Sequence, residues 1–222
     1  MKGNLRLGLV LAAFAAVGCA SLAVVYSVTG PAIAMQSEKA LQESLQEIFP
    51  EAKNFEDVTS SMTADLGAVK IEQAFLVKSD LAPIGVAIKA KGSSYGGTAR
   101  LLVGVGLARD IAGVRVLELN DTPGLGANAK NEAYYVNKET KTTFPGQFKG
   151  KFLTDGFEVK KDVVAITAAT ITSKALAGIV KTSADAAGAW LEKAAMTSPA
   201  ADQAQPGAAA PAAEGAAATG GK

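Results

Sequence analysis

The sequence predicts an α+β protein with a single N-terminal transmembrane helix, followed by one domain in which helices pack on an antiparallel sheet. Three features of the 222-residue chain support this fold class. An uncharged, mostly apolar run comes first, several short runs with strand periodicity fill the middle, and a long stretch with helical periodicity follows them. Strands joined by short connections pair antiparallel, and an amphipathic helix buries its apolar side on such a sheet.

The first 30 residues are expected to form a short cytoplasmic end and a membrane-spanning helix. As a helix, the apolar run from Leu7 to Val28 is long enough to cross the ~30 Å hydrocarbon layer. Lys2 and Arg6 precede this run, and positive residues stay on the cytoplasmic side. We therefore predict a single-pass protein of the inner (cytoplasmic) membrane, with its globular domain on the periplasmic side.

Two alternatives compete with a retained anchor. Ala32-Ile33-Ala34 resembles a signal-peptidase site, which would make the apolar run a cleaved signal peptide. Gly18-Cys19 could instead be the acylation point of a lipoprotein. The apolar run continues past Cys19 to Val28, which is longer than a usual signal core, so the sequence favours the anchor.

Residues 31–60 are expected to form a helical stalk between the membrane and the domain. From Glu38 to Phe49 the apolar residues fall at helical spacing, and Pro50 ends the helix. The domain is then expected to cover residues 61–196. Residues 197–222 are mostly Ala, Pro and Gly, and such a segment buries too little apolar surface to become ordered. We therefore predict a disordered tail there.

Within the domain, four runs have the character of strands. They are Val69–Val77, Ile84–Ala90, Thr98–Gly106 and Gly113–Leu119. In the second run Ile84, Val86 and Ile88 alternate with other residues, which is the period of a half-buried strand. We further predict a helix at Asn131–Lys138, a short strand pair within Gly156–Ala165, and a last helix that begins near Thr172.

Composition excludes several classes of function. The chain has 22 basic and 21 acidic residues, and the resulting net charge of +1 argues against nucleic acid as a partner. A single cysteine, Cys19, excludes intrachain disulfides, and the lack of histidine argues against most zinc, copper and haem sites. Without histidine, no hydroxyl has an imidazole base to activate it as a nucleophile. We predict no metal site and no catalytic residue, so a redox role requires an organic cofactor.

The most informative segment is Asp162–Lys174, with the sequence DVVAITAATITSK. Hydroxyl residues and two alanines gather there, where a strand pattern turns into a helix pattern. Small residues let a bulky ligand approach the backbone, and a helix start offers unpaired N–H groups to a phosphate. The simpler interpretation is a helix N-cap formed by Thr172 or Ser173.

Two glycine-containing loops are candidates for the walls of a ligand site. Asp121-Thr-Pro-Gly-Leu-Gly126 follows the fourth strand, and its glycines allow the backbone to pass close to a flat ligand. Tyr95-Gly96-Gly97 stands just before the third strand. Taken alone, each loop is more simply an ordinary turn.

Together, these segments resemble the FMN-binding domain of RnfG, the G component of Rnf-type electron transport complexes, and they are also similar to the C component of the sodium-pumping quinone reductase. The resemblance covers about residues 5–195. In that family a flavin transferase joins FMN through its phosphate to the last threonine of the pattern Asp-x-x-Ser/Thr-Gly-Ala-Thr. Aligned on Thr167, Ala169 and Thr170, this pattern implies a covalent FMN phosphoester on Thr170.

The sequence departs from the family pattern at two positions. The leading aspartate falls on Val164, while Asp162 is two residues too early, and the glycine falls on Ala168. If the transferase recognises the aspartate, modification of Thr170 would be inefficient or absent.

The resemblance implies an electron-carrier subunit of a membrane complex that couples electron transfer, of the ferredoxin/NAD type, to the translocation of sodium ions or protons. The residues that it implies around the FMN, besides Thr170, are Thr167, Ala169, Thr122, Gly124, Leu125, Gly126 and Tyr95. The expected partners are the other subunits of the complex and the flavin transferase. One alternative is a membrane-anchored binding or assembly module without covalent flavin, and another is a lipoprotein that binds a small ligand non-covalently.

Overall fold

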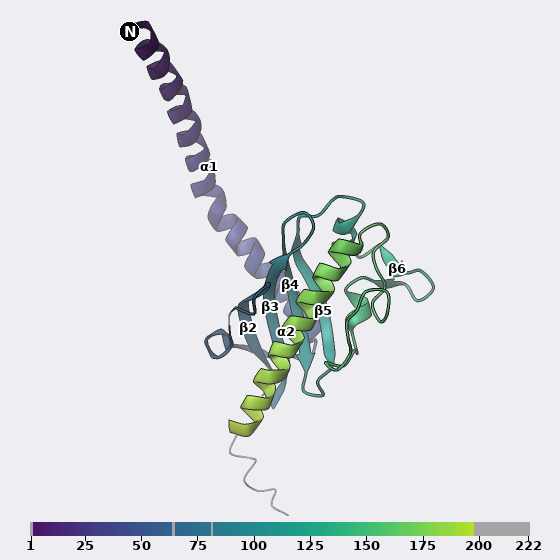
Figure 1. Cartoon of the computed structure of the whole chain (residues 1–222). Coiled ribbons are helices and arrows are strands. Elements are labelled where there is room, and N and C mark those ends of the chain that lie inside the picture. Colours follow the sequence, from purple (N-terminus) through teal and green to yellow (C-terminus); the bar gives the residue numbers. More distant parts are fainter. Residues whose placement is uncertain (1, 64, 81, 198–222) are drawn as a thin grey trace, which may run out of the picture.

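The computed structural model describes residues 2–63, 65–80 and 82–197, which form a sheet with a helix on each face (Figure 1). The helices are α1 (Lys2–Ile48) and α2 (Thr170–Thr197), and the strands of the sheet are β1 (Asn54–Asp57), β2 (Val69–Ser79), β3 (Ala82–Ser93), β4 (Thr98–Gly106) and β5 (Ile111–Leu119). A hairpin of β6 (Tyr135–Asn137) and β7 (Thr142–Thr143) and the 3-10 turns η1 (Thr59–Ser61), η2 (Gly126–Lys130) and η3 (Gly146–Phe148) complete the described elements. The predicted α+β class is confirmed.

The sheet is an antiparallel meander in the order β1-β2-β3-β4-β5. The four predicted strands are present, and each pairs with its neighbours in sequence, as Val86 does with Val105 across β3 and β4. The sequence does not predict β1, because its residues are largely exposed at the edge of the sheet and show no apolar alternation.

Both faces of the sheet are covered. On one face, Val86 and Ile88 of β3 belong to the core under α2. On the other face, Ala87 of β3 packs with Leu41 and Leu45 of α1. The prediction of a half-buried strand is therefore wrong for β3, because the residues expected on an open face are buried by α1.

Glycines in the sheet make room for the end of α1. A Cβ atom on Gly104 would lie 2.4 Å from Cγ2 of Ile48 and 2.7 Å from Cε2 of Phe49. A Cβ atom on Gly85 would lie 2.9 Å from Cε1 of Phe49. These distances are too short for non-bonded carbon atoms, so the Phe49 ring rests directly on the backbone of β3 and β4.

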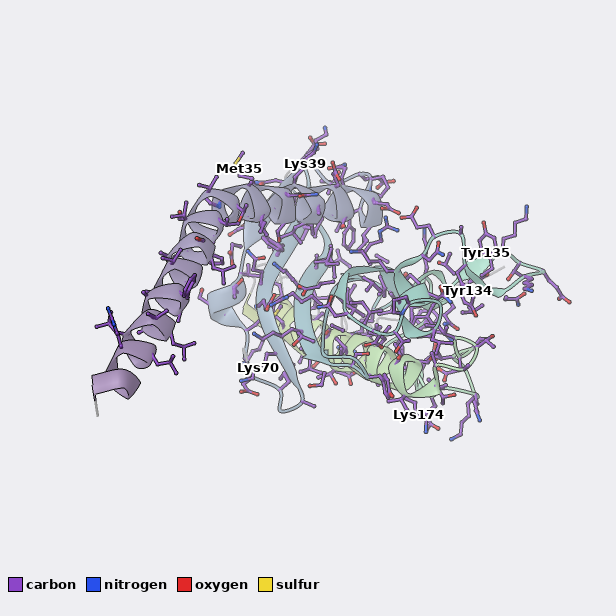
Figure 2. The ribbon with its side chains drawn as sticks, turned by 90° about the horizontal axis from the view of Figure 1, so that it is seen from above. Met35, Lys39, Lys70, Tyr134, Tyr135 and Lys174 are labelled. Atoms are coloured by element: carbon purple, nitrogen blue, oxygen red, sulfur yellow. The ribbon has the colours of Figure 1, made fainter. Side chains whose placement is uncertain are left out.

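The two halves of α1 have different surroundings. Among the described residues, α1 is the one helix long and apolar enough to cross a membrane, and its apolar window is fully exposed. Pro31 lies inside α1, lacks an N–H donor and clashes with the preceding turn. Figure 2 shows that the helix changes direction next to Met35. The apolar half therefore points away from the domain, while the end of the helix runs across the sheet.

The predicted helical stalk is helical only as far as Ile48. Leu41, Leu45 and Phe49 repeat at the predicted helical spacing, but they are buried against the sheet. Residues 54–57 of the predicted stalk form β1. The segment that was expected to separate the domain from the membrane thus contributes to the core of the domain.

The predicted helix at 131–138 is wrong. This segment contains a turn followed by β6. The side chain of Asn131 accepts a hydrogen bond from the N–H of Ala133 at 2.9 Å, a local contact that competes with helix formation.

The predicted strand pair within 156–165 is also wrong. These residues form turns, and Val159 and Val163 make a single isolated bridge. The Asp162 carboxylate accepts hydrogen bonds from the N–H groups of Phe157 at 2.8 Å and Glu158 at 2.5 Å, so it holds the segment in a tight turn. The predicted disordered tail lies outside the described residues, except for Thr197, the last residue of α2.

Candidate functional site

Three segments meet at the N-terminal end of α2 and enclose a cavity of about 550 Å³. They are the β3–β4 loop, the segment between β5 and η2, and the start of α2. The cavity is lined by Tyr95, Thr122, Leu125, Gly126, Ala168, Ala169, Thr170, Ile171 and Thr172. Its volume is in the range of small-molecule and cofactor sites.

Six of the eight residues predicted to surround a cofactor line this cavity, namely Tyr95, Thr122, Leu125, Gly126, Ala169 and Thr170. Gly124 does not line it. The φ angle of Gly124 is +77°, which lets the loop turn, and its carbonyl accepts a hydrogen bond from the Asn128 side chain at 2.8 Å. Thr167 also lies outside the lining, and its N–H donates to the Tyr134 hydroxyl at 3.3 Å.

Thr170 is the first residue of α2, so the last helix begins two residues earlier than predicted. The residue is half-buried at the wall of the cavity. Within the described part of the chain, its hydroxyl has no hydrogen-bond partner. The start of a helix carries unpaired N–H groups and a partial positive charge, both of which favour an anion beside Thr170.

Thr172 and Ser173, the predicted N-cap residues, have other roles. Both are buried, with 2% and 0% of their surfaces exposed. The Thr172 hydroxyl donates to Asp121 at 2.5 Å. The Ser173 hydroxyl donates to the carbonyl of Ala169 at 2.9 Å and accepts from the N–H of Ile166 at 3.0 Å. The N-cap interpretation is therefore wrong, and the two hydroxyls instead fix the helix start to its surroundings.

Asp121 joins the three segments of the site, although it is not among the residues that the sequence predicts there. Only 7% of its surface is exposed. Its carboxylate accepts hydrogen bonds from the Ser94 hydroxyl at 2.7 Å, the Gly96 N–H at 2.7 Å and the Thr172 hydroxyl at 2.5 Å. The only sequence signal for this role is an acidic residue two positions after the end of a strand.

The hydrogen bonds keep Asp121 ionised. Burial acts to raise the pKa of Asp121, but the hydrogen bonds from Thr172, Ser94 and the loop amides outweigh burial and hold the pKa below its ordinary value. Since the folded pKa is below the unfolded one, the carboxylate stabilises the fold above about pH 4. This contribution is lost as the pH falls further.

Gly126 is required by the packing around Asp121. A Cβ atom at this position would lie 2.5 Å from the Thr172 hydroxyl oxygen and 2.7 Å from Oδ2 of Asp121. Any larger residue would displace one of these two groups. Gly126 therefore lets the Thr-Pro-Gly-Leu-Gly loop pack directly against the start of α2, and it also lines the cavity.

Comparisons with known proteins agree with this arrangement. A family model described as FMN-binding domain matches residues 94–185, and one described as RnfG N-terminal region matches residues 2–48. The G component of the ion-translocating oxidoreductase complex of Vibrio cholerae is 31% identical over 186 residues, which cover 78% of this chain and 85% of that protein. The chain belongs to the RnfG family of ion-translocating oxidoreductase complexes.

Other members of the RnfG family match to a similar degree. The G component of the Na(+)-translocating ferredoxin:NAD(+) oxidoreductase complex of Acetobacterium woodii is 29% identical, over 77% of this chain and 85% of that protein. The G component of the proton-translocating ferredoxin:NAD(+) oxidoreductase complex of Clostridium ljungdahlii is 30% identical, over 72% of this chain and 78% of that protein. The matched residues 94–185 include the whole cavity lining and Asp121.

The two departures from the RnfG pattern lie on the segment that leads to Thr170. Val164 is 49% exposed, and its backbone N–H and carbonyl are both bonded to the side chain of Gln147, at 2.7 and 3.1 Å. Asp162 does not replace the missing aspartate, because its carboxylate holds the preceding turn. The family's aspartate thus has no equivalent in this chain, although the Gln147 side chain fixes the backbone at Val164.

The other departure, Ala168, has a left-handed backbone, with a φ angle of +58°. Glycine adopts this conformation without steric cost, whereas alanine does not. We predict that Ala168→Gly stabilises the protein by about 1 kcal/mol and raises the melting temperature by roughly 2–4 °C. The matched control is Ala175→Gly inside α2, which should lower the melting temperature by a similar amount. A lower melting temperature for Ala168→Gly would contradict the left-handed backbone at this position.

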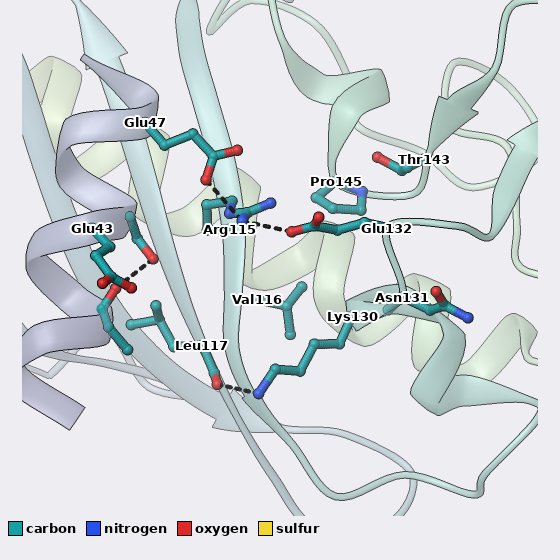
Figure 3. A pocket seen from close by; sticks show the side chains of 13 residues that line it. Glu43, Glu47, Arg115, Val116, Leu117, Lys130, Asn131, Glu132, Thr143 and Pro145 are labelled. Atoms are coloured by element: carbon teal, nitrogen blue, oxygen red, sulfur yellow. Dashed lines mark hydrogen bonds and ion pairs between the residues drawn. The ribbon is translucent and has the colours of Figure 1, made fainter. Parts of the chain in front are cut away.

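A second cavity, of about 300 Å³, lies between the end of α1, β5 and the segment after η2 (Figure 3). Nη2 of Arg115 is 2.7 Å from a carboxylate oxygen of Glu47 on α1 and 2.7 Å from one of Glu132. The Lys130 ammonium donates to the carbonyl of Leu117 at 2.9 Å. Arg115 thus links α1 to the segment after η2, and Lys130 links η2 to β5. None of the predicted cofactor residues lines this cavity.

Proposed function

We propose that the protein is an electron-carrier subunit of an ion-translocating oxidoreductase complex, with FMN attached through its phosphate to Thr170. The single observation that carries this proposal is the position of the Thr170 hydroxyl. This hydroxyl has no hydrogen-bond partner among the described residues. Thr170 is also the first residue of the 28-residue helix α2, and it lines the cavity together with the Thr-Pro-Gly-Leu-Gly loop.

The residues of the cavity fit FMN. The phosphate would lie at the N-terminus of α2, where the helix contributes about 0.3–1 kcal/mol to holding an anion at an exposed end. Leu125 and the glycine backbone beside it would bracket the flat ring, and Thr122 would supply a hydroxyl for its polar edge. Tyr95, which is 66% exposed, also lines the cavity and would cover the ring from the β3–β4 loop.

The proposed attachment uses a separate transferase, which is supported by the absence of a histidine that could activate the threonine. The hydroxyl oxygen of Thr170 would form a bond to the phosphorus of an activated FMN donor, the donor would lose its leaving group, and the hydroxyl proton would pass to solvent or the transferase.

Bound FMN supplies one- and two-electron redox chemistry. Thr170 would act only as a tether, which makes retention independent of the free flavin concentration.

We further propose that α1 anchors the protein in the inner membrane and that the domain lies on the periplasmic side. The apolar half of α1 is exposed, as a membrane helix requires, and Lys2 and Arg6 stand at its N-terminal end. Two of the relatives belong to complexes named for ferredoxin and NAD, so other subunits of such a complex are the proposed partners and the proposed source of electrons.

The proposed function is tested by the intact mass of the protein purified from its own membranes. We expect a mass increase of one FMN phosphoester and in-gel flavin fluorescence after denaturation. The alternative, an anchored binding or assembly module without covalent flavin, is favoured by Val164 in place of the motif aspartate and predicts the unmodified mass. Protein from a host without the transferase cannot distinguish the two.

The role of the missing aspartate can be tested directly. Because the Val164 side chain is exposed and its backbone is held by Gln147, Val164→Asp should not disturb the fold. With limiting transferase, we expect the variant to become flavinylated several times faster than the natural chain, as measured by the mass adduct over time. Leu107→Asp, at another exposed apolar position, controls for the added charge. Equal rates in all three proteins would show that the transferase does not recognise this position.

A further inference from the structure

The buried carboxylate of Asp121 contacts every wall of the cavity. Ser94 and Gly96, which bond to it, flank Tyr95 in the β3–β4 loop. Thr172, the third donor, belongs to the first turn of α2. Thr122 follows Asp121 in the chain, so one side chain controls the relative position of residues that are otherwise far apart in the sequence.

The far end of the Thr-Pro-Gly-Leu-Gly loop is fixed by direct contact with Asp121. The hypothetical Cβ atom of Gly126 would lie 2.7 Å from Oδ2 and 2.8 Å from Cβ of Asp121, so the loop backbone rests on this side chain. The loop end, the helix start and the β3–β4 loop are thereby packed around a single group, which is itself 7% exposed. Loss of this group would release three walls at once.

The charge of Asp121 is not neutralised by a cation. Its donors are two hydroxyls and backbone amides, and among the described residues no lysine or arginine forms an ion pair with it. Neutral donors stabilise a carboxylate but leave its net charge in place. A buried negative charge beside a cavity is screened less than an exposed one, so it opposes the addition of electrons to whatever lies in that cavity.

We propose that Asp121 is a positioning residue of the flavin site. Its carboxylate holds the three walls of the cavity together, an arrangement that we call the Asp121 clamp. Its charge lowers the reduction potential of the flavin bound there. The part of this inference that concerns the potential rests on the proposed function. The part that concerns the walls does not, because the contacts exist in the chain itself.

The charge is tested in Asp121→Asn, which keeps the shape of the side chain and one carbonyl acceptor. With the full, flavin-loaded chain, a spectroelectrochemical titration should give a midpoint potential above that of the natural protein. Asp57→Asn is the matched control, because it removes the same charge from β1 at the far edge of the sheet. A potential that is unchanged, lowered or shifted only as much as in the control would overturn the electrostatic role.

The Asp121 clamp is tested with the variant Asp121→Ala, in the full chain without flavin. We expect hydrogen exchange of the Gly96 amide to become about tenfold faster or more, and the melting temperature to fall by roughly 5–10 °C. Thr172→Val, which removes one donor and keeps the size of the side chain, should have smaller effects of the same sign and serves if Asp121→Ala does not fold. Unchanged exchange at Gly96 in the folded variants would overturn the clamp.

The two proposals can fail separately. If the native protein carries no FMN adduct, the proposed function fails, and the proposed effect on the reduction potential fails with it. Hydrogen exchange at the Gly96 amide then still tests whether Asp121 holds the walls of the cavity together. If the adduct is present but Asp121→Asn leaves the potential where it was, the proposed function stands and the electrostatic inference is wrong.

Discussion

Thr170→Ala is expected to abolish covalent flavin completely, because no other hydroxyl is placed equivalently among the described residues. Thr170 lines the cavity at the first residue of α2, whereas Thr167 lies outside the lining and Thr172 is buried and bonded to Asp121. We expect the mass of the variant to lack the FMN increment and its gel band to lack fluorescence. The fold should persist, since the Thr170 hydroxyl makes no hydrogen bond within the described part of the chain.

Two matched variants make this result specific. Thr167→Ala removes a hydroxyl three residues away and is expected to leave the adduct in place. Thr170→Ser keeps a hydroxyl at position 170 and is expected to retain at least part of it. All variants should be produced with the transferase present. An equal fluorescent signal in Thr170→Ala and Thr167→Ala would refute the assignment of the attachment site.

The site could be predicted from the sequence where its residues form continuous motifs. The Thr-Pro-Gly-Leu-Gly loop, the Tyr-Gly-Gly turn and the Thr-Ala-Ala-Thr segment each carry local signals, and the structure brings residues from all three to one cavity. Asp121 could not be predicted in the same way. Its role depends on partners 25 to 51 residues distant, at Gly96, Ser94 and Thr172, and such contacts leave no periodicity in the sequence.

Strands β2 to β5 were predictable from their strand-like runs, but β1 and the segments around the site were not. Residues 131–138 contain apolar residues at spacings that a helix and a strand share, and a side chain–backbone bond at Asn131 decides between them. In residues 156–165, the turn depends on the carboxylate of Asp162. Local hydrogen bonds of single side chains thus outweigh apolar patterning in both segments.

The helix in the first part of the predicted stalk shows a different limit of sequence reasoning. Its apolar spacing from Leu41 to Phe49 predicts the helix correctly, yet spacing alone does not reveal what the apolar side faces. The complementary signal lies in the sheet, where Gly85 and Gly104 leave space for an aromatic ring. Only the pairing of these distant positions shows that α1 is part of the domain.

Phe49→Ala should therefore be among the most destabilising substitutions in the chain. Phe49 is 6% exposed, and its ring lies on the backbone of β3 and β4, where the glycines on either side have no side chains to fill the space that it would leave. Replacing a buried Phe by Ala costs about 3–5 kcal/mol, and more when the surroundings cannot collapse. For a chain of this size, the melting temperature should fall by roughly 6–20 °C.

The measurement is the thermal unfolding of the full chain in detergent, with Gln42→Ala as the control on the exposed side of α1, the helix that Phe49 directly follows. The control should change the melting temperature by less than about 2 °C, because surface substitutions rarely exceed 0.5 kcal/mol. If residues 31–60 were a stalk that does not contact the domain, the two variants would have the same melting temperature, since neither side chain would then touch the sheet. Equal melting temperatures would therefore show that α1 does not pack on the domain. A large difference would mean that the C-terminal end of α1 packs on the sheet as part of the domain.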